Sequence, residues 1–285
     1  MRWGKLFRGD LRNLEDVRAC FQRYPIDAVI HFAALSRVGE SGQKPEEYYH
    51  TNVVGTLNLL QVMRERQVNR IIFSSSAAVY GEPEQVPISE DHPLRPVNVY
   101  GRTKVMMETF MADYARAYGF HYAALRYFNA AGADPEGETG EMHHPETHRI
   151  PILIRAAFGH QEALDVYGTD YPTPDGSAIR DYIHVSDLAQ AHLSALRLLR
   201  QGRDLGPINL GSNQGFSVLE VFHAAETVLA KPIPYRLGPR REGDPVILVA
   251  GNAKAKETLG WSPGNGDLPT LIRSTAAFLQ SFWSR

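Results

Sequence analysis

The sequence contains one cysteine and no long apolar run. A disulfide needs two thiols, so the single Cys20 excludes an internal disulfide and a metal site built from several cysteines. Cys20 lies within a helical pattern, where a free cysteine is typical of a small buried apolar residue. No apolar run reaches the roughly 18–20 residues that a membrane-spanning helix needs. We therefore expect no membrane partner.

An excess of charge is also absent. The 285 residues carry 30 Lys and Arg against 32 Asp and Glu, for a formal net charge of −2. This balance provides no electrostatic attraction for nucleic acid or for an anionic membrane surface. The first ten residues lack the apolar core of a signal peptide. We expect a cytoplasmic protein that does not bind nucleic acid.

The eleven histidines do not form a familiar metal motif. No His-x-x-x-His pair falls on a predicted helix, and His143, His144 and His148 lie in a loop rich in Gly, Pro and Glu. Their spacing does not match the common zinc ligand sets. The expectation from spacing is that the chain has no metal site.

Strands and helices alternate along the first half of the chain. Continuous apolar runs are typical of strands buried on both faces of a parallel sheet, and the sequence predicts such strands at 28–34 and 70–76. Two further strands are predicted, a short one at 4–10 and another at 121–128. Helical spacing predicts helices at 14–24 (with Asn13 as N-cap), 45–66 and 100–118. Strands separated by helices of ten or more residues indicate an α/β fold with a parallel sheet.

The second half of the chain is less regular. Residues 130–150 are predicted as loop, and Pro151 is predicted to start a short helix. Further short strands are predicted at 164–168, 180–185 and 207–211, the last of them returning to the main sheet. Ser217 and Glu220 have the spacing of a capping box, so they predict a helix at 217–230, and two more helices are predicted at 253–259 and 268–283.

A dinucleotide-binding fold needs a glycine-rich loop after its first strand, and this sequence has none. Neither Gly-x-Gly-x-x-Gly nor Gly-x-x-Gly-x-x-Gly occurs, and the acidic residue that should end the second strand is also missing. One interpretation is that the fold does not bind a nucleotide. The other is that about fifty N-terminal residues, carrying the Gly-rich strand-turn-helix, are absent from an N-terminally truncated Rossmann-like doubly wound sheet.

The most informative pattern is Tyr100-Gly-Arg-Thr-Lys104, which follows three serines at the end of a predicted strand. Residues four apart on a helix lie on one face, with β-carbons about 5–6 Å apart. An ammonium beside Tyr100 favours the phenolate, which lowers the tyrosine pKa from about 10 and makes a usable general base. Ser76 at the strand end is placed to hydrogen-bond the same substrate hydroxyl. Tyr-x-x-x-Lys occurs by chance in about one chain of this length in two, so the pair alone does not establish an enzyme.

A series of other short stretches accompanies this pattern in a fixed order. They lie at 9–13, 31–35, 38–41, 44–49, 52, 73–81, 100–104, 125–129, 168–176, 180–185 and 239–244. Together they resemble the UDP-glucose 4-epimerases, a family of extended short-chain dehydrogenases/reductases, nearly from end to end. The match begins inside the family's pattern, which favours a missing N-terminus over a different fold.

The resemblance implies an NAD-dependent isomerase of galactose metabolism that interconverts UDP-glucose and UDP-galactose. In this family the C4 hydroxyl of the hexose is transiently oxidised. Tyr100 would take the hydroxyl proton, Lys104 would lower the tyrosine pKa and contact the nicotinamide ribose, and Ser76 would orient the substrate oxygen. The resemblance also implies an incomplete NAD-binding domain at 1–129, to which 181–215 return, and a mainly substrate-binding region at 130–285.

Further site residues carry over one by one. The implied cofactor contacts are Asp10, Leu11, Phe32, Ala33, Ala34, Asn52, Ser74, Tyr100, Lys104 and Tyr127. The implied contacts with the UDP-hexose are Ser76, Asn129, Tyr167, Arg180, Arg241 and Asp244. Simpler roles stay open, because Phe32–Ala34 also fit a plain buried strand, Arg180 fits a surface ion pair with Asp181, and Asn129 fits a turn cap.

Some positions depart from the family pattern or separate it from its rivals. Ser36-Arg37 stands where the family often has a lysine that contacts NAD, and His148-Arg149 replaces a frequent pair ending in leucine beside the substrate. At position 248 the size of the side chain affects, in the family, whether N-acetylated hexoses are accepted, and Leu248 is intermediate in size. Ala77-Ala78 stands where 4,6-dehydratases carry an acid/base pair, which argues against dehydration.

Three alternatives to a UDP-glucose 4-epimerase stay open. Two are 4-epimerases of UDP-pentoses or of UDP-GlcNAc, which use the same catalytic set. The third is a catalytically impaired fragment that binds nucleotide sugars. The resemblance also implies a homodimer formed through the helices near 45–66 and 98–118.

Overall fold

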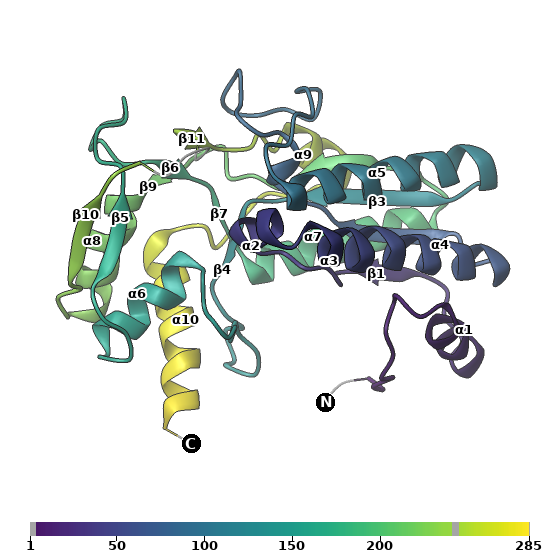
Figure 1. Ribbon diagram of the computed structural model, residues 1–285, viewed down its shortest axis with the longest axis horizontal. Coiled ribbons are helices and arrows are strands. Elements are labelled where there is room, and N and C mark those ends of the chain that lie inside the picture. The colour runs from purple at the N-terminus through teal and green to yellow at the C-terminus, as the bar shows by residue number, and fades with distance from the viewer. Residues whose placement is uncertain (1–3, 241–244, 285) are drawn as a thin grey trace. The chain divides into compact units, whose positions relative to one another are not determined.

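The computed structural model describes residues 4–240 and 245–284 (Figure 1). The chain divides into two compact units. Unit 1 contains the described residues of 1–82, 93–126 and 195–208. Unit 2 contains the described residues of 83–92, 127–194 and 209–285. Each unit has its own core and is described separately.

Unit 1 is built on a four-stranded sheet in the order β1-β2-β3-β8. Its strands are β1 (Val29–His31), β2 (Arg70–Ser74), β3 (His121–Arg126) and β8 (Gly206–Asn209). The pairs β1–β2 and β2–β3 are parallel, and Ile72 lies between Ile30 and Ala123 in register. The predicted α/β fold with a parallel sheet is therefore confirmed, as is the return of the 207–211 segment to this sheet.

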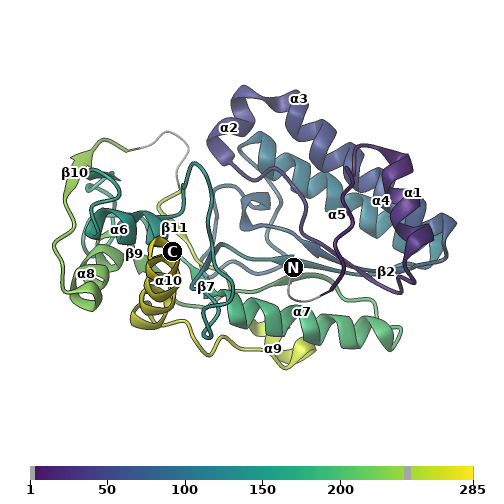
Figure 2. The same ribbon diagram turned by 90° about the horizontal axis from the view of Figure 1, so that it is seen from below.

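Helices on one side of this sheet supply much of the core of unit 1 (Figure 2). They are α1 (Leu14–Arg23), α4 (Gly55–Glu65) and α5 (Val99–Tyr118). Apolar side chains of α4 and α5, among them Met63 and Met107, pack with Phe73 of β2 in one buried cluster. The predicted cap of α1 is present, because the Asn13 side chain accepts a hydrogen bond from the backbone of Glu15.

Several predictions in unit 1 are wrong in their details. Residues 4–10 form no strand, because no described strand lies beside them to complete a ladder. The run at 28–34 forms only β1, and it is not buried on both faces, since Ile30 is 38% and Phe32 59% exposed. The cause is the position of β1, whose one neighbour among the described strands is β2.

The helix predicted at 45–66 is interrupted. Its parts are α3 (Pro45–Tyr48), a π-helical turn η1 (Tyr49–Val54) and α4. A short helix α2 (Val38–Gln43), which the sequence did not predict, precedes it. A π-turn inserts one extra residue per turn and is found mostly at functional sites, so the change of spacing at η1 directs attention to the side chains it carries.

Unit 2 contains three small sheets and three helices that share a core. The sheets pair β4 (Asn129–Ala131) with β7 (Tyr182–His184), β5 (Leu164–Tyr167) with β10 (Tyr235–Gly238), and β6 (Ile179–Arg180) with both β11 (Ile247–Leu248) and β9 (Phe216–Ser217). The helices of the core are α6 (Arg149–Ala157), α8 (Val218–Leu229) and α10 (Leu268–Trp283). Leu153, Phe222 and Leu271 from these helices are fully buried together.

The remaining helices are α7 (Val185–Arg200) and α9 (Ala253–Leu259). The predicted capping box is confirmed at α8, where Ser217 and Glu220 hydrogen-bond reciprocally. Helix α6 starts at Arg149, two residues before the predicted start at Pro151. Over 4–240 and 245–284, none of the helices combines the length and the apolar character that crossing a bilayer requires.

Candidate active site

The two serines predicted for the site lie at the carboxyl end of β2, where Ser74 is the last residue of the strand and Ser76 follows it. Ser76 is the N-cap of the 3₁₀ turn η2 (Ala77–Val79), and its Oγ accepts a hydrogen bond from the Ala78 N–H at 3.2 Å. Ligands of open parallel sheets bind outside the carboxyl ends of the strands. Ser76 therefore stands at the edge of the sheet where chemistry is expected, on a short turn that fixes its backbone.

Tyr100 lies in the first turn of α5, close to the turn that carries Ser76. The helix is capped by Asn98, whose side chain accepts the Gly101 N–H at 2.8 Å. A Cβ added at Gly101 would lie 2.4 Å from the Ala78 carbonyl oxygen, closer than any real contact. Glycine at 101 thus lets the start of α5 pack directly on η2, which brings the backbone segments of Tyr100 and Ser76 together.

Lys104 is buried one turn further along α5, with 2% of its surface exposed. Its Nζ donates to the Ser74 carbonyl oxygen at 2.7 Å and lies 4.7 Å from the centre of the Phe73 ring and 5.6 Å from that of the Tyr100 ring. Burial lowers the pKa of Lys104 to about 7, and the negative charge of Glu108 opposes this shift. The predicted association of the tyrosine ring with the lysine ammonium is present.

A buried ionic network, which the sequence analysis missed, lies behind this lysine. Glu108 accepts two hydrogen bonds from Arg126, at 2.9 and 2.6 Å, and one from the Ser75 hydroxyl at 2.5 Å. Arg126 also donates to the Tyr80 hydroxyl at 2.9 Å. The sequence does contain one indication of this network, because Lys104 and Glu108 are four residues apart and so lie on one face of the predicted helix. The network ties α5 to β3 and to the segment after β2.

Asn52 joins the loop after β1 to α5. Its Nδ2 donates to the Leu35 carbonyl and to Thr103 Oγ1, both at 3.0 Å, and its Oδ1 accepts the Leu35 N–H at 2.7 Å. Asn52 is fully buried in the π-turn η1. Both amide hydrogens are used within unit 1, so in this structure Asn52 positions the loop at Leu35. Its predicted contact with a cofactor stays a prediction.

Four of the residues predicted to contact the cofactor line one apolar cavity of unit 1. The cavity has a volume of about 530 Å³, and its lining includes Asp10, Leu11, Phe32 and Ala33. The Asp10 carboxylate forms a 2.5 Å ion pair with Arg12, whose hydrogen bonds lower the pKa of Asp10 to about 2. Asp10 is therefore held as an anion in the lining of an apolar cavity.

Three residues predicted for the substrate line a second cavity, which lies in unit 2. Asn129, Tyr167 and Arg180 border a volume of about 340 Å³, together with His148 and Arg149. The Asn129 amide donates to the Asp181 carbonyl at 2.8 Å, and Arg180 Nη1 donates to the Ile179 carbonyl at 2.8 Å. Two guanidinium groups on one cavity suit an anion with several oxygens, such as a diphosphate.

The other predicted positions are more scattered. The Tyr127 ring packs edge-on against His192, with centroids 6.3 Å apart. Leu248 pairs with Arg180 across β11 and β6, so it lies beside the lining of the second cavity. Arg241 and Asp244 lie outside the described residues.

Comparison with known proteins settles the family. A model of the NAD dependent epimerase/dehydratase family matches residues 2–211. The chain belongs to this family. A UDP-glucose 4-epimerase of Streptococcus mutans is 48% identical to this chain over 279 residues. The aligned residues cover 98% of this chain and 84% of the relative. The resemblance stated from the sequence is thereby confirmed.

Solved structures agree with this assignment. UDP-glucose 4-epimerase from Brucella ovis in complex with NAD superposes with a TM-score of 0.94 at 46% identity, over 97% of this chain and 86% of the other. UDP-glucose 4-epimerase from Stenotrophomonas maltophila, with bound NAD and formylated UDP-arabinopyranose, has a TM-score of 0.92 at 39% identity, over 97% of this chain and 82% of the other. The Rossmann-like fold of this epimerase/dehydratase family member is thereby shown.

The residues of this family member fit part of an NAD site. An ammonium has three N–H donors, and among the described residues Lys104 donates to Ser74 alone, which leaves donors for ribose hydroxyls. The apolar cavity with Asp10 in its lining suits an adenosine group. The sequence contains no Gly-x-Gly-x-x-Gly loop, the usual pyrophosphate-binding turn of this fold. The expected contact of Phe32, Ala33 and Ala34 with the pyrophosphate and ribose side of the cofactor stays a prediction.

Proposed function

We propose that this protein catalyses the reversible 4-epimerisation of UDP-glucose and UDP-galactose. The observation that carries the proposal is the arrangement of Tyr100, Lys104 and Ser76. The tyrosine begins a helix that packs on the Ser76 turn, and the lysine ammonium lies 5.6 Å from the centre of the tyrosine ring. The names of the relatives support the same reaction, since those compared above are UDP-glucose 4-epimerases.

In this mechanism the protein moves one proton at the sugar oxygen. Tyr100 takes the proton of the C4 hydroxyl, while the Ser76 hydroxyl hydrogen-bonds the same oxygen and holds it. The Lys104 ammonium stabilises the phenolate through its positive charge. When bound, NAD supplies the reversible oxidation at C4. Tyr100 returns the proton to the oxygen of the 4-keto sugar after the sugar has presented its other face, so the net reaction is an isomerisation.

Dehydration is disfavoured by the residues that follow Ser76. Elimination of water needs a further acid and base beside the sugar. Ala77 and Ala78 form the 3₁₀ turn at this place and carry no ionisable group. The described segment that follows Ser76 therefore adds no acid or base for elimination to the tyrosine that serves oxidation at C4.

The cavity in unit 2 is assigned to the UDP group. Arg180 and Arg149 line it and would pair with the diphosphate, Asn129 would hydrogen-bond the sugar nucleotide, and Tyr167 would lie against the uracil. Arg241 and Asp244 are included by family resemblance, for the diphosphate and the uridine ribose. Leu248, paired with Arg180, is the position at which we expect the choice between plain and N-acetylated hexoses to be made.

A pentose substrate is the second candidate. It is favoured by the sugar bound in the Stenotrophomonas maltophila structure, which is formylated UDP-arabinopyranose. The catalytic set would be the same, because a pentopyranose carries the reacting C4 hydroxyl and lacks only the C6 group. Comparing the turnover of UDP-galactose, UDP-arabinopyranose and UDP-GalNAc on the same preparation distinguishes the candidates.

A cytoplasmic homodimer completes the proposal. Helices α4 and α5 fall within the segments expected at a four-helix dimer contact, and exposed apolar side chains such as Leu57 on α4 and Met106 on α5 support this. Sedimentation velocity on the purified chain tests the assignment. A single species at the monomer mass of 31.8 kDa would contradict it.

The decisive experiment replaces the base. With excess NAD and UDP-galactose, product UDP-glucose is followed through a coupled dehydrogenase. Tyr100→Phe should lower kcat by about 10²- to 10⁴-fold, the usual contribution of a general base. Tyr118→Phe at the exposed end of the same helix is the matched control and should keep full turnover. Retention of most turnover by Tyr100→Phe would show that another group removes the proton.

A further inference from the structure

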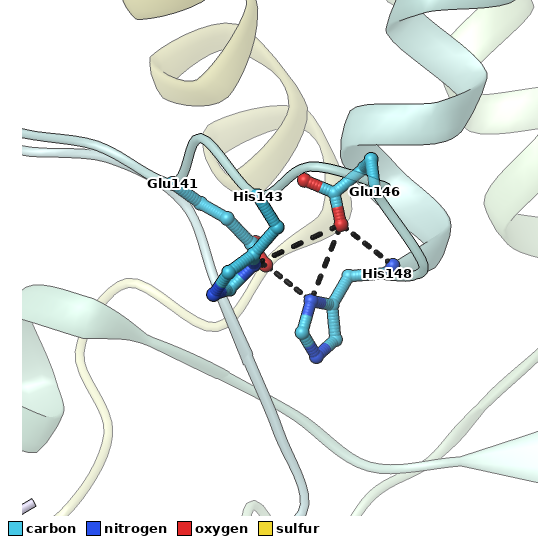
Figure 3. Close-up of side chains that lie close together, drawn as sticks. All are labelled: Glu141, His143, Glu146 and His148. Atoms are coloured by element: carbon cyan, nitrogen blue, oxygen red, sulfur yellow. Dashed lines mark hydrogen bonds and ion pairs between the residues drawn. The ribbon is translucent and has the colours of Figure 1, made fainter. Parts of the chain in front are cut away.

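Two carboxylates and two imidazoles converge in the loop between β4 and α6. Figure 3 shows Glu141, His143, Glu146 and His148 turned toward one another within unit 2. Each contributes one ligand atom, and all four of these atoms lie within 4.8 Å of one another. The catalytic residues of unit 1 are not involved, so this cluster requires a separate explanation.

The ligand atoms of the cluster lie close enough for one ion to bind them after small shifts, and two pairs of them, His143–Glu141 and His148–Glu141, are direct ion pairs that the ion would have to replace. His143 Nδ1 lies 2.8 Å from Glu141 Oε1 and 4.0 Å from Glu146 Oε1, and His148 Nδ1 lies 3.4 Å from the same Glu146 oxygen. Tetrahedral zinc with bonds of about 2.0–2.1 Å places its ligand atoms about 3.3–3.4 Å apart. The observed separations lie on both sides of this value, so shifts of about 1 Å would complete the tetrahedron.

The carboxylates of the cluster are held in place before any ion binds. The Glu146 side chain is only 5% exposed, and its Oε1 accepts the backbone N–H groups of Thr147 at 2.7 Å and His148 at 2.8 Å. Glu141 is 16% exposed. Hydrogen bonds that fix a ligand carboxylate are typical of metal sites. Both imidazoles are about half exposed, which leaves a path by which a hydrated ion can enter.

We propose that Glu141, His143, Glu146 and His148 bind one divalent transition-metal ion of the Zn²⁺ type. Imidazole with carboxylate is a donor set for zinc and its neighbours, whereas Mg²⁺ and Ca²⁺ prefer oxygen alone. Two carboxylates also balance the two positive charges of the ion. The proposal departs from the expectation drawn from spacing, because the folded loop, and not a helix, brings the four ligands together.

The ion is assigned a structural role. His148 is the N-cap position of α6 and, with Thr147 and Arg149, lines the 340 Å³ cavity of unit 2. An ion bound to four side chains of 141–148 would fix this wall of the cavity and the first turn of α6. The proposal does not depend on epimerase activity, and its test uses metal binding and stability.

The competing explanation is a metal-free network of ion pairs. Protonated imidazoles next to carboxylates would hold the same four side chains together without an ion. The two explanations differ in stoichiometry. A metal site binds one ion per chain with saturation, and an ion-pair network binds none.

The test uses the full chain after treatment with a chelator. Isothermal titration with Zn²⁺ should give one site per chain, and Co²⁺ should give the visible absorption of a tetrahedral complex. His143→Ala and Glu146→Gln should each weaken Zn²⁺ binding by at least the roughly 10- to 100-fold that loss of supporting groups costs. Zn²⁺ should raise the melting temperature of the parent chain by mass action and should do so less in these variants.

His144→Ala is the matched control, because His144 lies in the same loop outside the cluster. It should bind Zn²⁺ like the parent chain. Circular dichroism of the metal-free variants shows whether each is folded, and His143→Gln, a change at a half-exposed side chain, replaces any variant that is not. Absence of a saturable site, or equal loss of binding in His144→Ala and His143→Ala, would overturn the proposal and leave the ion-pair network.

Discussion

The buried Lys104 predicts that a variant without enzymatic activity is more stable than the parent chain. The pKa of Lys104 falls from its ordinary value of 10.5 to about 7 because burial disfavours the ammonium. At about 1.4 kcal/mol for each pH unit, this fall corresponds to a destabilisation of about 5 kcal/mol when the lysine is charged. Lys104→Met keeps a similar length and removes the charge.

The net gain is smaller than the electrostatic penalty. Methionine cannot donate to the Ser74 carbonyl, and the loss of that 2.7 Å hydrogen bond costs about 1–3 kcal/mol. We therefore expect Lys104→Met to raise the free energy of unfolding by about 2–4 kcal/mol near pH 6. Turnover should fall at the same time, because the phenolate of Tyr100 loses its stabilising cation.

The way in which the stability difference between Lys104→Met and the parent chain changes with pH shows whether the buried charge of Lys104 is its cause. Below pH 7 the lysine is charged in both the folded and the unfolded chain, so the full penalty is present. Between pH 7 and 10.5 the unfolded chain binds a proton that the folded chain does not, so the parent chain gains stability with rising pH. The advantage of Lys104→Met should therefore shrink above pH 7 and vanish about 1.5–3 pH units higher. Beyond that point the parent chain should be the more stable, because its neutral lysine keeps the hydrogen bond to Ser74.

The assay is urea unfolding followed by far-UV circular dichroism at pH 6, 7.5 and 9. Lys256→Met, at an exposed position of α9, is the control and should change stability little at any of these pH values. Two results would refute the reasoning. One is a Lys104→Met variant less stable than the parent at pH 6, and the other is a stability difference that does not change with pH.

Three further predictions concern unit 1. Burial lowers the pKa of His31 to about 3, so between pH 6.5 and 3 the unfolded chain binds a proton that the folded chain does not. The free energy of unfolding should therefore fall by up to about 1.4 kcal/mol for each pH unit as the pH drops through this range. The urea midpoint of His31→Gln, in which this position cannot titrate, should fall less steeply with pH. Glu108→Gln leaves the Arg126 charge buried without its partner and should cost about 3–5 kcal/mol in urea unfolding, part of which Arg126→Met in the same chain should restore. Gly101→Ala places a Cβ 2.4 Å from the Ala78 carbonyl and should lower kcat on the order of 10²-fold by displacing the base, whereas an unchanged kcat would show that α5 need not pack so closely.

Local signals in the sequence were sufficient for much of unit 1 and for the helix ends. Asn13 and Ser217 were predicted as caps because capping needs only residues within one turn, and both caps are present. The prediction that 28–34 is a strand buried on both faces is wrong because burial depends on residues far away in the sequence. An apolar run shows that a segment can be buried, but burial of Phe32 depends on which strands lie beside it, and this information is not local.

The candidate site divides in the same way. Lys104 and Tyr100 were found from spacing along one helix, and Glu108 was available from the same spacing. Its partner Arg126 lies 18 residues away on β3, so their ion pair could not be predicted without knowing that β3 packs beside α5. The contacts of the two cavities came from family resemblance and not from spacing. Arg180 is an example, because nothing local separates a cavity guanidinium from a surface one.

The buried charges of Lys104 and Glu108 predict that NAD raises the melting temperature of the protein partly by binding the Lys104 ammonium. The charge of Glu108 favours the Lys104 ammonium, but the oxygens of Glu108 are already bound by Arg126 and Ser75, so Glu108 acts on Lys104 through its charge and not through a hydrogen bond. A ligand whose hydroxyl oxygens accept from Lys104 Nζ would favour the ammonium and raise its pKa. Saturating NAD should therefore raise the melting temperature of the parent chain more than that of Lys104→Met, and the difference should be larger at pH 6.5 than at pH 9. Thermal melts of both proteins with and without NAD measure this. Equal shifts in the two proteins would mean that NAD stabilises the fold without contacting Lys104.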